Sequence, residues 1–248
     1  MSNRTVVEVE NLSKTFHIGF WRKRVEAVKN LSFEVREKEI FGIVGPNGAG
    51  KTTAMKVMTN LIFPDEGDVR LFGKPVDRTA SRRRLGYLPE EPYFYDHLTV
   101  TELIKYYGAL HGMSRREVAE HLDDLLELVG LEDVRKRPLR KFSKGMRQRA
   151  GIAQALVNDP DLVILDEPQS GLDPIGRREV RDLIFDLRRR GKTVIFSSHI
   201  LVDVEAVCDR VAVMNGGRLV EVANLDELED EAEQAVELTL RRVDTQLL

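Results

Sequence analysis

Residues 45–53 read Gly45-Pro46-Asn47-Gly48-Ala49-Gly50-Lys51-Thr52-Thr53 and fit the pattern G-x-x-x-x-G-K-[ST] of a phosphate-binding loop. Residues 39–44 are a short apolar run that predicts a buried strand, and residues 54–58 are good helix formers. In such a strand–loop–helix unit, glycines let backbone N–H groups surround phosphate oxygens, and the helix start adds a positive dipole. We therefore expect the Lys51 ammonium on the outer phosphates of a ligand and the Thr52 hydroxyl on a magnesium ion. The alternative is a glycine-rich turn with an incidental lysine.

The composition is that of a globular protein with one large domain, or a domain and a subdomain. The chain has 248 residues, of which 42% are hydrophobic and 32% charged, and a formal net charge of −3 that argues against a general attraction to nucleic acid. Cys208 is the single cysteine, so no disulfide can form within the chain, which fits a reducing compartment. Residues 1–5 lack the apolar core of a signal peptide, and no apolar run has the length of a membrane span. If the chain works at a membrane, we expect a partner to supply the spanning part.

Alternating and apolar segments predict an α/β core that is interrupted by helices. Residues 5–45 contain alternating strands of an open sheet, and residues 68–72 form a further strand between two turns. Residues 20–24 are a basic aromatic insertion that we expect to be a solvated loop, with a contact to lipid headgroups as the alternative. The α/β pattern resumes with a buried strand at 161–165.

Residues 91–157 have the pattern of an all-helical subdomain. Thr99-Val100-Thr101-Glu102 and Ser114-Arg115-Arg116-Glu117 both fit the capping box, in which a hydroxyl and a carboxylate satisfy the free N–H groups of a helix start. Apolar residues recur at helical spacing behind the second box, and Gly130 is expected to end that helix.

Further helix and hairpin signals follow the strand at 161–165. Asp173 is expected to cap a helix that has Pro174 at its first position and ends at Gly191, and Asn215-Gly216-Gly217 predicts a hairpin. Past Asn224 the chain is acidic, and both a peripheral helix and an incomplete tail domain are open there. We divide the chain into residues 1–90 (the β subdomain and the first part of the core), 91–157 (the helical subdomain), 158–224 (the second part of the core) and 225–248 (an acidic tail of unknown role).

Residues 162–167, Leu-Val-Ile-Leu-Asp-Glu, end an apolar strand with two adjacent carboxylates. Ligands gather at the carboxyl ends of the strands of a parallel sheet. Asp166 is therefore placed to hold magnesium beside Thr52, and Glu167 to accept a proton from an attacking water or to keep that water in line. The alternative is a helix cap or a surface turn, because Asp and Glu are common after strands.

Two more positions are candidates for phosphate chemistry. His199 ends another apolar strand, where its imidazole would reach the outermost phosphate and the water near it, although a structural histidine is the alternative. Ser143 stands at an N-cap position before a helix rich in small residues. Its hydroxyl, the N–H of Gly145 and the helix start make a second anion site, separate from the first, with a capped basic helix as the alternative.

Together these motifs resemble those of the nucleotide-binding subunit of ABC transporters, over about residues 5–222 and in the family's order. The resemblance implies an α/β P-loop NTPase (RecA-like) core with an N-terminal antiparallel β subdomain and an inserted α-helical subdomain. The residues that it assigns to ATP binding are the adenine-stacking Phe16 and the Walker A residues Gly45, Pro46, Asn47, Gly48, Ala49, Gly50, Lys51, Thr52 and Thr53. It assigns catalysis to Glu167 and His199, and magnesium binding to Thr52, Asp166 and Glu90. By the same resemblance, Ser143, Lys144 and Gly145 belong to the signature that contacts the ATP of a partner subunit, and Asp173 belongs to the D-loop.

The chain departs from the family's common pattern at three places. The usual signature Ser-Gly-Gly-Gln is Ser143-Lys144-Gly145-Met146 here, which keeps the hydroxyl and the second glycine N–H but loses the amide and adds a cation. Glu90 stands where the family usually has a glutamine, so an oxygen for magnesium remains, with an added negative charge. Gln169 replaces a common threonine, with no effect that we can assign. The signature variant resembles that of bacterial exporter-type and drug- or polysaccharide-type ATPases.

The resemblance implies an ATPase that powers transport through a separate transmembrane permease, with export favoured by the signature variant. ATP would lie between the phosphate loop of one subunit and the signature of another in a head-to-tail homodimer or heterodimer, because two anion-binding helix starts cannot easily converge on one nucleotide within one chain. The chain would be peripheral on the cytoplasmic face of the cell membrane. Tyr93, Phe94 and Tyr95 are candidates for an exposed permease contact, or else part of the helical core.

Two other functions stay open at this point. A soluble ABC-type ATPase that acts on the ribosome or on nucleic acid is disfavoured by the acidic balance, by the lack of long coiled-coil insertions and by the single nucleotide-binding module. A binding module with an inactive site is disfavoured because Lys51, Asp166, Glu167 and His199 are all intact. We therefore expect ATP and Mg²⁺ as ligands, a permease and a second nucleotide-binding subunit as partners, and no nucleic acid.

Overall fold

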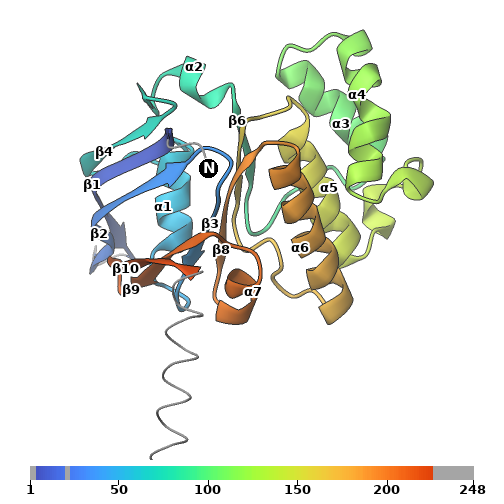
Figure 1. The fold of residues 1–248 in the computed structure, drawn as a ribbon. Helices are drawn as coiled ribbons and strands as arrows, with labels where there is room; N and C mark the ends of the chain where they lie inside the picture. Colours follow the sequence, from blue (N-terminus) through green and yellow to red (C-terminus); the bar gives the residue numbers. More distant parts are fainter. Residues whose placement is uncertain (1–3, 20–22, 226–248) are drawn as a thin grey trace, which may run out of the picture.

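The computed structural model describes residues 4–19 and 23–225. Part of the basic aromatic insertion, at 20–22, and the acidic tail from 226 onward lie outside the described residues. The described strands form two sheets (Figure 1). An antiparallel sheet contains, in spatial order, β2 (Lys23–Arg36), β1 (Thr5–Ile18), β4 (Glu66–Leu71) and β5 (Lys74–Pro75).

The second sheet is parallel except for a hairpin at one edge. Its strands are, in spatial order, β10 (Arg218–Asn224), β9 (Arg210–Asn215), β3 (Ile40–Val44), β8 (Thr193–Ser198), β7 (Leu162–Leu165) and β6 (Leu85–Leu88). The predicted hairpin is confirmed as the antiparallel pair β9–β10. Val44 pairs with Ser198, and Leu165 with Phe196, so β3, β7 and β8 end together and the residues that follow them begin at one edge of the sheet.

Helices cover both faces of this sheet (Figure 1). They are α1 (Lys51–Met58), α2 (Thr79–Arg82), α3 (Val100–Leu110), α4 (Arg115–Leu128), α5 (Lys144–Leu156), α6 (Pro174–Arg189) and α7 (Leu201–Glu205), with the 3₁₀ turns η1 (Glu132–Val134) and η2 (Leu139–Lys141). Helix α1 lies between the two sheets, whereas α5 and α6 lie on the opposite face, with α3 and α4 farther out. The predicted α/β core with an N-terminal antiparallel sheet and helices between β6 and β7 is confirmed.

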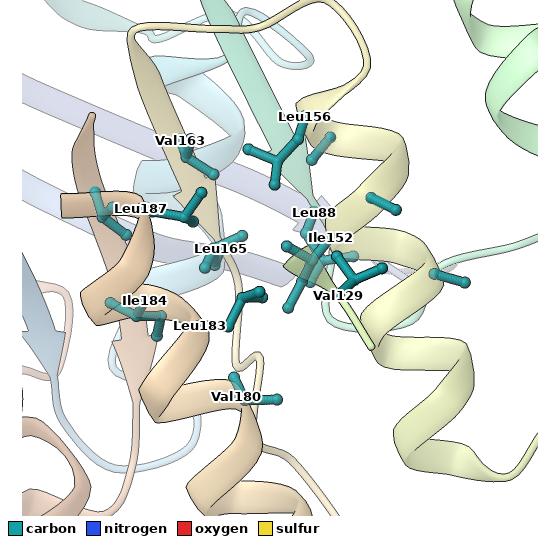
Figure 2. Packing of buried hydrophobic residues seen from close by; sticks show 14 of the residues in the cluster. Leu88, Val129, Ile152, Leu156, Val163, Leu165, Val180, Leu183, Ile184 and Leu187 are labelled. Atoms are coloured by element: carbon teal, nitrogen blue, oxygen red, sulfur yellow. The ribbon is translucent and has the colours of Figure 1, made fainter. Parts of the chain in front are cut away.

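The core consists of two hydrophobic clusters, one on each face of the parallel sheet. Met55 and Met58 of α1 pack between the sheets with Ile43 and Ile195. On the other face, Leu183 and its neighbours on α6 meet apolar residues of β6, β7 and α5 (Figure 2). Strands β3 and β7 are buried along their whole length, as their continuous apolar sequences predict for strands covered on both faces.

The local signals at the helix ends are confirmed. Ser114 accepts a hydrogen bond from the N–H of Glu117 at 3.2 Å, and the Glu117 carboxylate accepts one from the N–H of Ser114 at 2.7 Å. The box at Thr99 and Glu102 has the same reciprocal bonds. Asp173 caps α6 with Pro174 in the first turn.

Helix α5 packs directly onto the parallel sheet. A Cβ on Gly86 of β6 would collide with the carbonyl oxygen of Ala155, and one on Gly151 would collide with a methyl group of Leu88. Glycine on each element therefore allows the helix and strand backbones to approach closely.

Of the two alternatives for residues 93–95, an exposed contact or part of the helical core, the second holds for Phe94. Tyr93 is 86% exposed and Tyr95 is exposed as well, but Phe94 is only 4% exposed and belongs to the cluster that α5 and α6 form. The phenylalanine has no polar atom to keep in water, so its ring fills the space beside Gly151 of α5. Among the described helices, none is long and apolar enough to cross a membrane.

Candidate active site

The loop at residues 45–50 leaves β3 and enters α1 at the carboxyl edge of the parallel sheet. It lies tightly against neighbouring strands, because a Cβ on Gly45 would collide with the carbonyl oxygen of Met214, and one on Gly50 with that of Ala27. Gly50 has a φ of 100°, a left-handed conformation that residues with a Cβ rarely adopt. It is also the N-cap of α1 and has no side chain, so the helix start is open to an anion.

Lys51 lies folded over this loop and forms a buried ion pair. Its ammonium donates a hydrogen bond to the carbonyl oxygen of Gly45 at 2.7 Å and lies 3.2 Å from Oε1 of Glu167. The two side chains are only 6% and 8% exposed, so each charge depends on the other for compensation. A phosphate that enters the loop competes with Glu167 for this ammonium.

Asp166 lies one residue past β7 and meets Thr52 of α1. Its Oδ1 accepts hydrogen bonds from Thr52 Oγ1 at 3.1 Å and from Ser197 Oγ at 2.7 Å. Its Oδ2 is buried and has no hydrogen-bond partner among the residues that the structure describes. Burial raises the pKa of Asp166, against the opposing effect of the two hydroxyl groups.

The residues around Asp166 fit a magnesium ion. The Thr52 hydroxyl and the Asp166 carboxylate offer oxygen ligands of the kind that Mg²⁺ binds. A cation here would also give the unpaired Asp166 Oδ2 a partner. Within residues 4–19 and 23–225 there is no cluster of three or more His, Cys, Asp or Glu side chains suited to a metal.

Glu167 connects the loop to His199. Its Oε2 lies 2.8 Å from His199 Nδ1, while Oε1 contacts the Lys51 ammonium, so the carboxylate lies between the side chains of His199 and Lys51. Its φ of 47° is left-handed, which is uncommon for a residue with a side chain and is often found at functional sites. Its N–H donates to Ser197 Oγ at 2.8 Å.

Ser197 was not predicted as a site residue from the sequence, yet its hydroxyl contacts both carboxylate residues. It accepts from the N–H of Glu167 and donates to Asp166, and the residue is fully buried at the end of β8. The available sequence signal was a pair of serines at the end of an apolar strand, just before His199. Their hydroxyl groups are expected to be buried there, and buried hydroxyl groups need hydrogen-bond partners.

The loop borders a pocket of about 400 Å³ that also has Val25, Glu90 and Glu167 in its lining. Glu90 is exposed and follows shortly after the end of β6. Phe16 pairs with Val25 across β1 and β2, so both side chains lie on the same face of that sheet. The structure thus brings the phosphate loop, Glu90, Asp166, Glu167 and His199 together, with Phe16 on the strand pair beside them.

The signature residues lie elsewhere. Ser143 caps α5, and its Oγ accepts a hydrogen bond from the N–H of Met146 at 3.2 Å, as expected. Ser143 and Lys144 are exposed and do not line the loop pocket. Lys144 instead reaches the D-loop, which comprises residues 170–173. A Cβ on Gly171 of that loop would collide with the Lys144 ammonium. Asp173 accepts a hydrogen bond from the N–H of Gly176 at 2.7 Å, so its observed contact is the helix cap.

Residues 28–170 match the family model of the ABC transporter. The chain is 47% identical over 226 residues to the uncharacterized ABC transporter ATP-binding protein sll0415 of Synechocystis, a match that covers 90% of this chain and 64% of that protein. The chain therefore spans a little under two thirds of the length of this curated relative.

Solved structures show the same fold. CbiO1 from Clostridium perfringens, which is described as part of the ABC transporter complex cbiONQ, superposes with a TM-score of 0.80 and 28% identity, over 96% of this chain and 97% of that one. The ATP-binding cassette MJ0796, in a dimeric post-hydrolysis state with ADP and Pi, gives a TM-score of 0.79 at 26% identity, over 88% of this chain and 98% of that one.

Proposed function

The chain belongs to the family of ABC transporter ATP-binding proteins, and on that premise we propose that it is the ATP-hydrolysing subunit of a membrane transporter that works with a separate permease. Its fold is the P-loop NTPase fold of that family, and the family's members are ATPases. The observation that carries the proposal is the convergence of Lys51, the Thr52–Asp166 pair, Glu167 and His199 at one sheet edge.

These residues divide the work of phosphoryl transfer. Lys51 binds the outer phosphates of ATP after leaving Glu167, and Phe16 stacks on the adenine. Glu167 accepts the proton of the attacking water, and His199, 2.8 Å away, orients that carboxylate and reaches toward the terminal phosphate. Thr52, Asp166 and Glu90 would hold magnesium, which supplies neutralisation of the charge on the phosphate oxygens when bound.

A second nucleotide-binding subunit completes the site in our proposal. Ser143 and Gly145 present a helix start and a hydroxyl at an exposed position away from the loop pocket, so they serve a nucleotide on another subunit. The dimeric state of MJ0796 with ADP and Pi supports this arrangement. ATP then bridges two subunits, and hydrolysis weakens the bridge.

We propose that the permease contacts an exposed aromatic surface made of Tyr93, Tyr95 and Tyr106. Tyr95 and Tyr106 pack edge to face with ring centroids 5.9 Å apart, and both are exposed, as is Tyr93. Exposed aromatic residues are typical of protein interfaces. A permease at this surface would keep the chain on the cytoplasmic face of the membrane, with export as the direction that the Ser143-Lys144-Gly145-Met146 variant favours.

Two measurements test the proposal. The purified chain should release phosphate from ATP in the presence of Mg²⁺, and the absence of any such release would refute the enzymatic part. A tagged chain captured from solubilised membranes of its source cells should bring down a multi-spanning membrane protein. Capture of ribosomes or RNA in its place would favour the soluble alternative.

A further inference from the structure

Two buried polar atoms, one on a proposed magnesium ligand and one on a tyrosine that this ligand influences electrostatically, have no hydrogen-bond partner among the described residues. They are the hydroxyl oxygen of Tyr87 and Oδ2 of Asp166, each unpaired with respect to every residue in the described ranges. Leaving a buried polar atom unpaired is unfavourable, so such atoms commonly mark a site that another group completes. One of the two is a phenol, which both donates and accepts, and the other is a carboxylate oxygen.

The two atoms lie on the same face of the parallel sheet. Tyr87 of β6 pairs with Ile164 of β7, and the N–H of Asp166 donates to the carbonyl oxygen of Leu88 at 2.9 Å, which continues the pairing past the end of β7. Alternate residues of a strand share a face, so Asp166 lies on the side of Ile164 and therefore of Tyr87. That is also the α1 side, because Ile164 and Tyr87 both pack in the cluster around Met55.

The electrostatic surroundings keep the Tyr87 phenol neutral. Burial raises its pKa above the ordinary value of 10, and the negative charges of Asp166 and Glu90 raise it further. Both carboxylates are among the oxygens proposed for magnesium. The Tyr87 hydroxyl is therefore a neutral hydrogen-bonding group that feels the charges of two of the proposed metal ligands.

We propose that Tyr87 is a positioning residue for the metal: its hydroxyl and Asp166 Oδ2 together bind a water ligand of the magnesium ion. The inference rests on the proposed function, because it takes the Thr52–Asp166 position to be the metal site. Mg²⁺ usually keeps several of its waters in protein sites, and groups that bind those waters orient the direct ligands. Each of the two atoms has a hydrogen-bonding position that no described residue fills.

The test is Tyr87→Phe, which removes one oxygen and keeps the ring in the core. Mn²⁺ is the probe, titrated into protein saturated with ADP and followed by electron paramagnetic resonance. Loss of an outer-shell partner typically weakens metal binding by about 10- to 100-fold, and we expect that loss here, with metal-free ADP affinity unchanged. The matched control is Tyr107→Phe on α3, a partly buried tyrosine that packs on Tyr106, which should leave Mn²⁺ affinity as it is.

A thermal unfolding curve of the metal-free protein separates positioning from a structural role. If Tyr87→Phe lowers the unfolding temperature and leaves Mn²⁺ affinity unchanged, Tyr87 acts only in the core and the proposal is overturned. Asp166→Asn distinguishes this failure from failure of the proposed function. If Asp166→Asn weakens Mn²⁺ binding and Tyr87→Phe does not, only the role of Tyr87 is wrong; if neither does, the metal site itself is wrong.

Discussion

Replacing Glu167 with Gln is expected to tighten the binding of ADP, because the nucleotide and Glu167 compete for Lys51. The Lys51 ammonium lies 3.2 Å from the carboxylate, with both side chains less than a tenth exposed. A hydrogen bond to a charged group contributes about 1.5–3 kcal/mol net, and each 1.4 kcal/mol is a factor of ten in affinity. Removing the competing charge should therefore lower the Kd for ADP by about 10- to 100-fold.

The assay is an equilibrium titration of fluorescent ADP at a protein concentration low enough to keep the chain monomeric. ADP is preferable to ATP because it separates loop binding from ATP-driven dimerisation. Glu39→Gln is the matched control: Glu39 is also buried and ion-paired, 3.0 Å from Arg210, but lies at the other end of β3. That variant should lose stability and keep its affinity for ADP.

Hydrolysis in Glu167→Gln should fall sharply while ATP binding persists, which would trap an ATP-bound dimer. A folded variant with unchanged or weaker ADP affinity would show that Lys51 does not have to leave Glu167 to bind phosphates. Near-normal phosphate release would remove Glu167 from its proposed role as the base. The two outcomes are independent, because the first concerns the ground state and the second the reaction.

Lys51→Ala should weaken ADP binding by about 10- to 100-fold, the value of the lost charged hydrogen bond, and unchanged affinity would contradict the whole site. Ser143→Ala should cost about 1 kcal/mol of unfolding free energy through the lost cap, and should abolish ATP-dependent dimerisation in size-exclusion chromatography while ADP binding stays normal. The pKa values of Glu102 and Glu117 lie below the ordinary 4.5, because each carboxylate accepts a backbone hydrogen bond in its capping box. A lowered pKa means stabilisation that is present above pH 4.5 and is lost as the pH falls through the lowered value. The difference in unfolding free energy between wild type and Glu102→Ala/Glu117→Ala should therefore shrink between pH 7 and pH 3, and a constant difference would contradict the assignment.

The features that follow from short-range rules were predictable. Capping boxes need only residues three apart, and the strand before residue 45 needs only a short apolar run. The meeting of Asp166 and His199 at one edge was predictable as well, because the carboxyl ends of parallel strands come together there.

The remaining features depend on packing between distant segments. The Lys51–Glu167 pair joins residues far apart in the sequence, each of which compensates the buried charge of the other, and no local pattern reveals it. Ser197 was missed since its role depends on the register of β7 against β8. The alternatives for Phe94 stayed open because three consecutive aromatic residues give no periodicity from which to tell the inner one from the outer two.

The close approach of α5 to β6 limits which segments of the protein can be expressed or exchanged separately. The backbone contact between Gly86 and Ala155 fixes the last helix of the 91–157 segment to the strand that leads to Glu90. A recombinant fragment of residues 91–157 would expose the apolar side of α5, so we expect it to aggregate on expression. The chain without that segment would in turn expose to solvent the part of β6 and β7 that α5 covers. Swapping helical segments between relatives would therefore need the strand exchanged together with the helix.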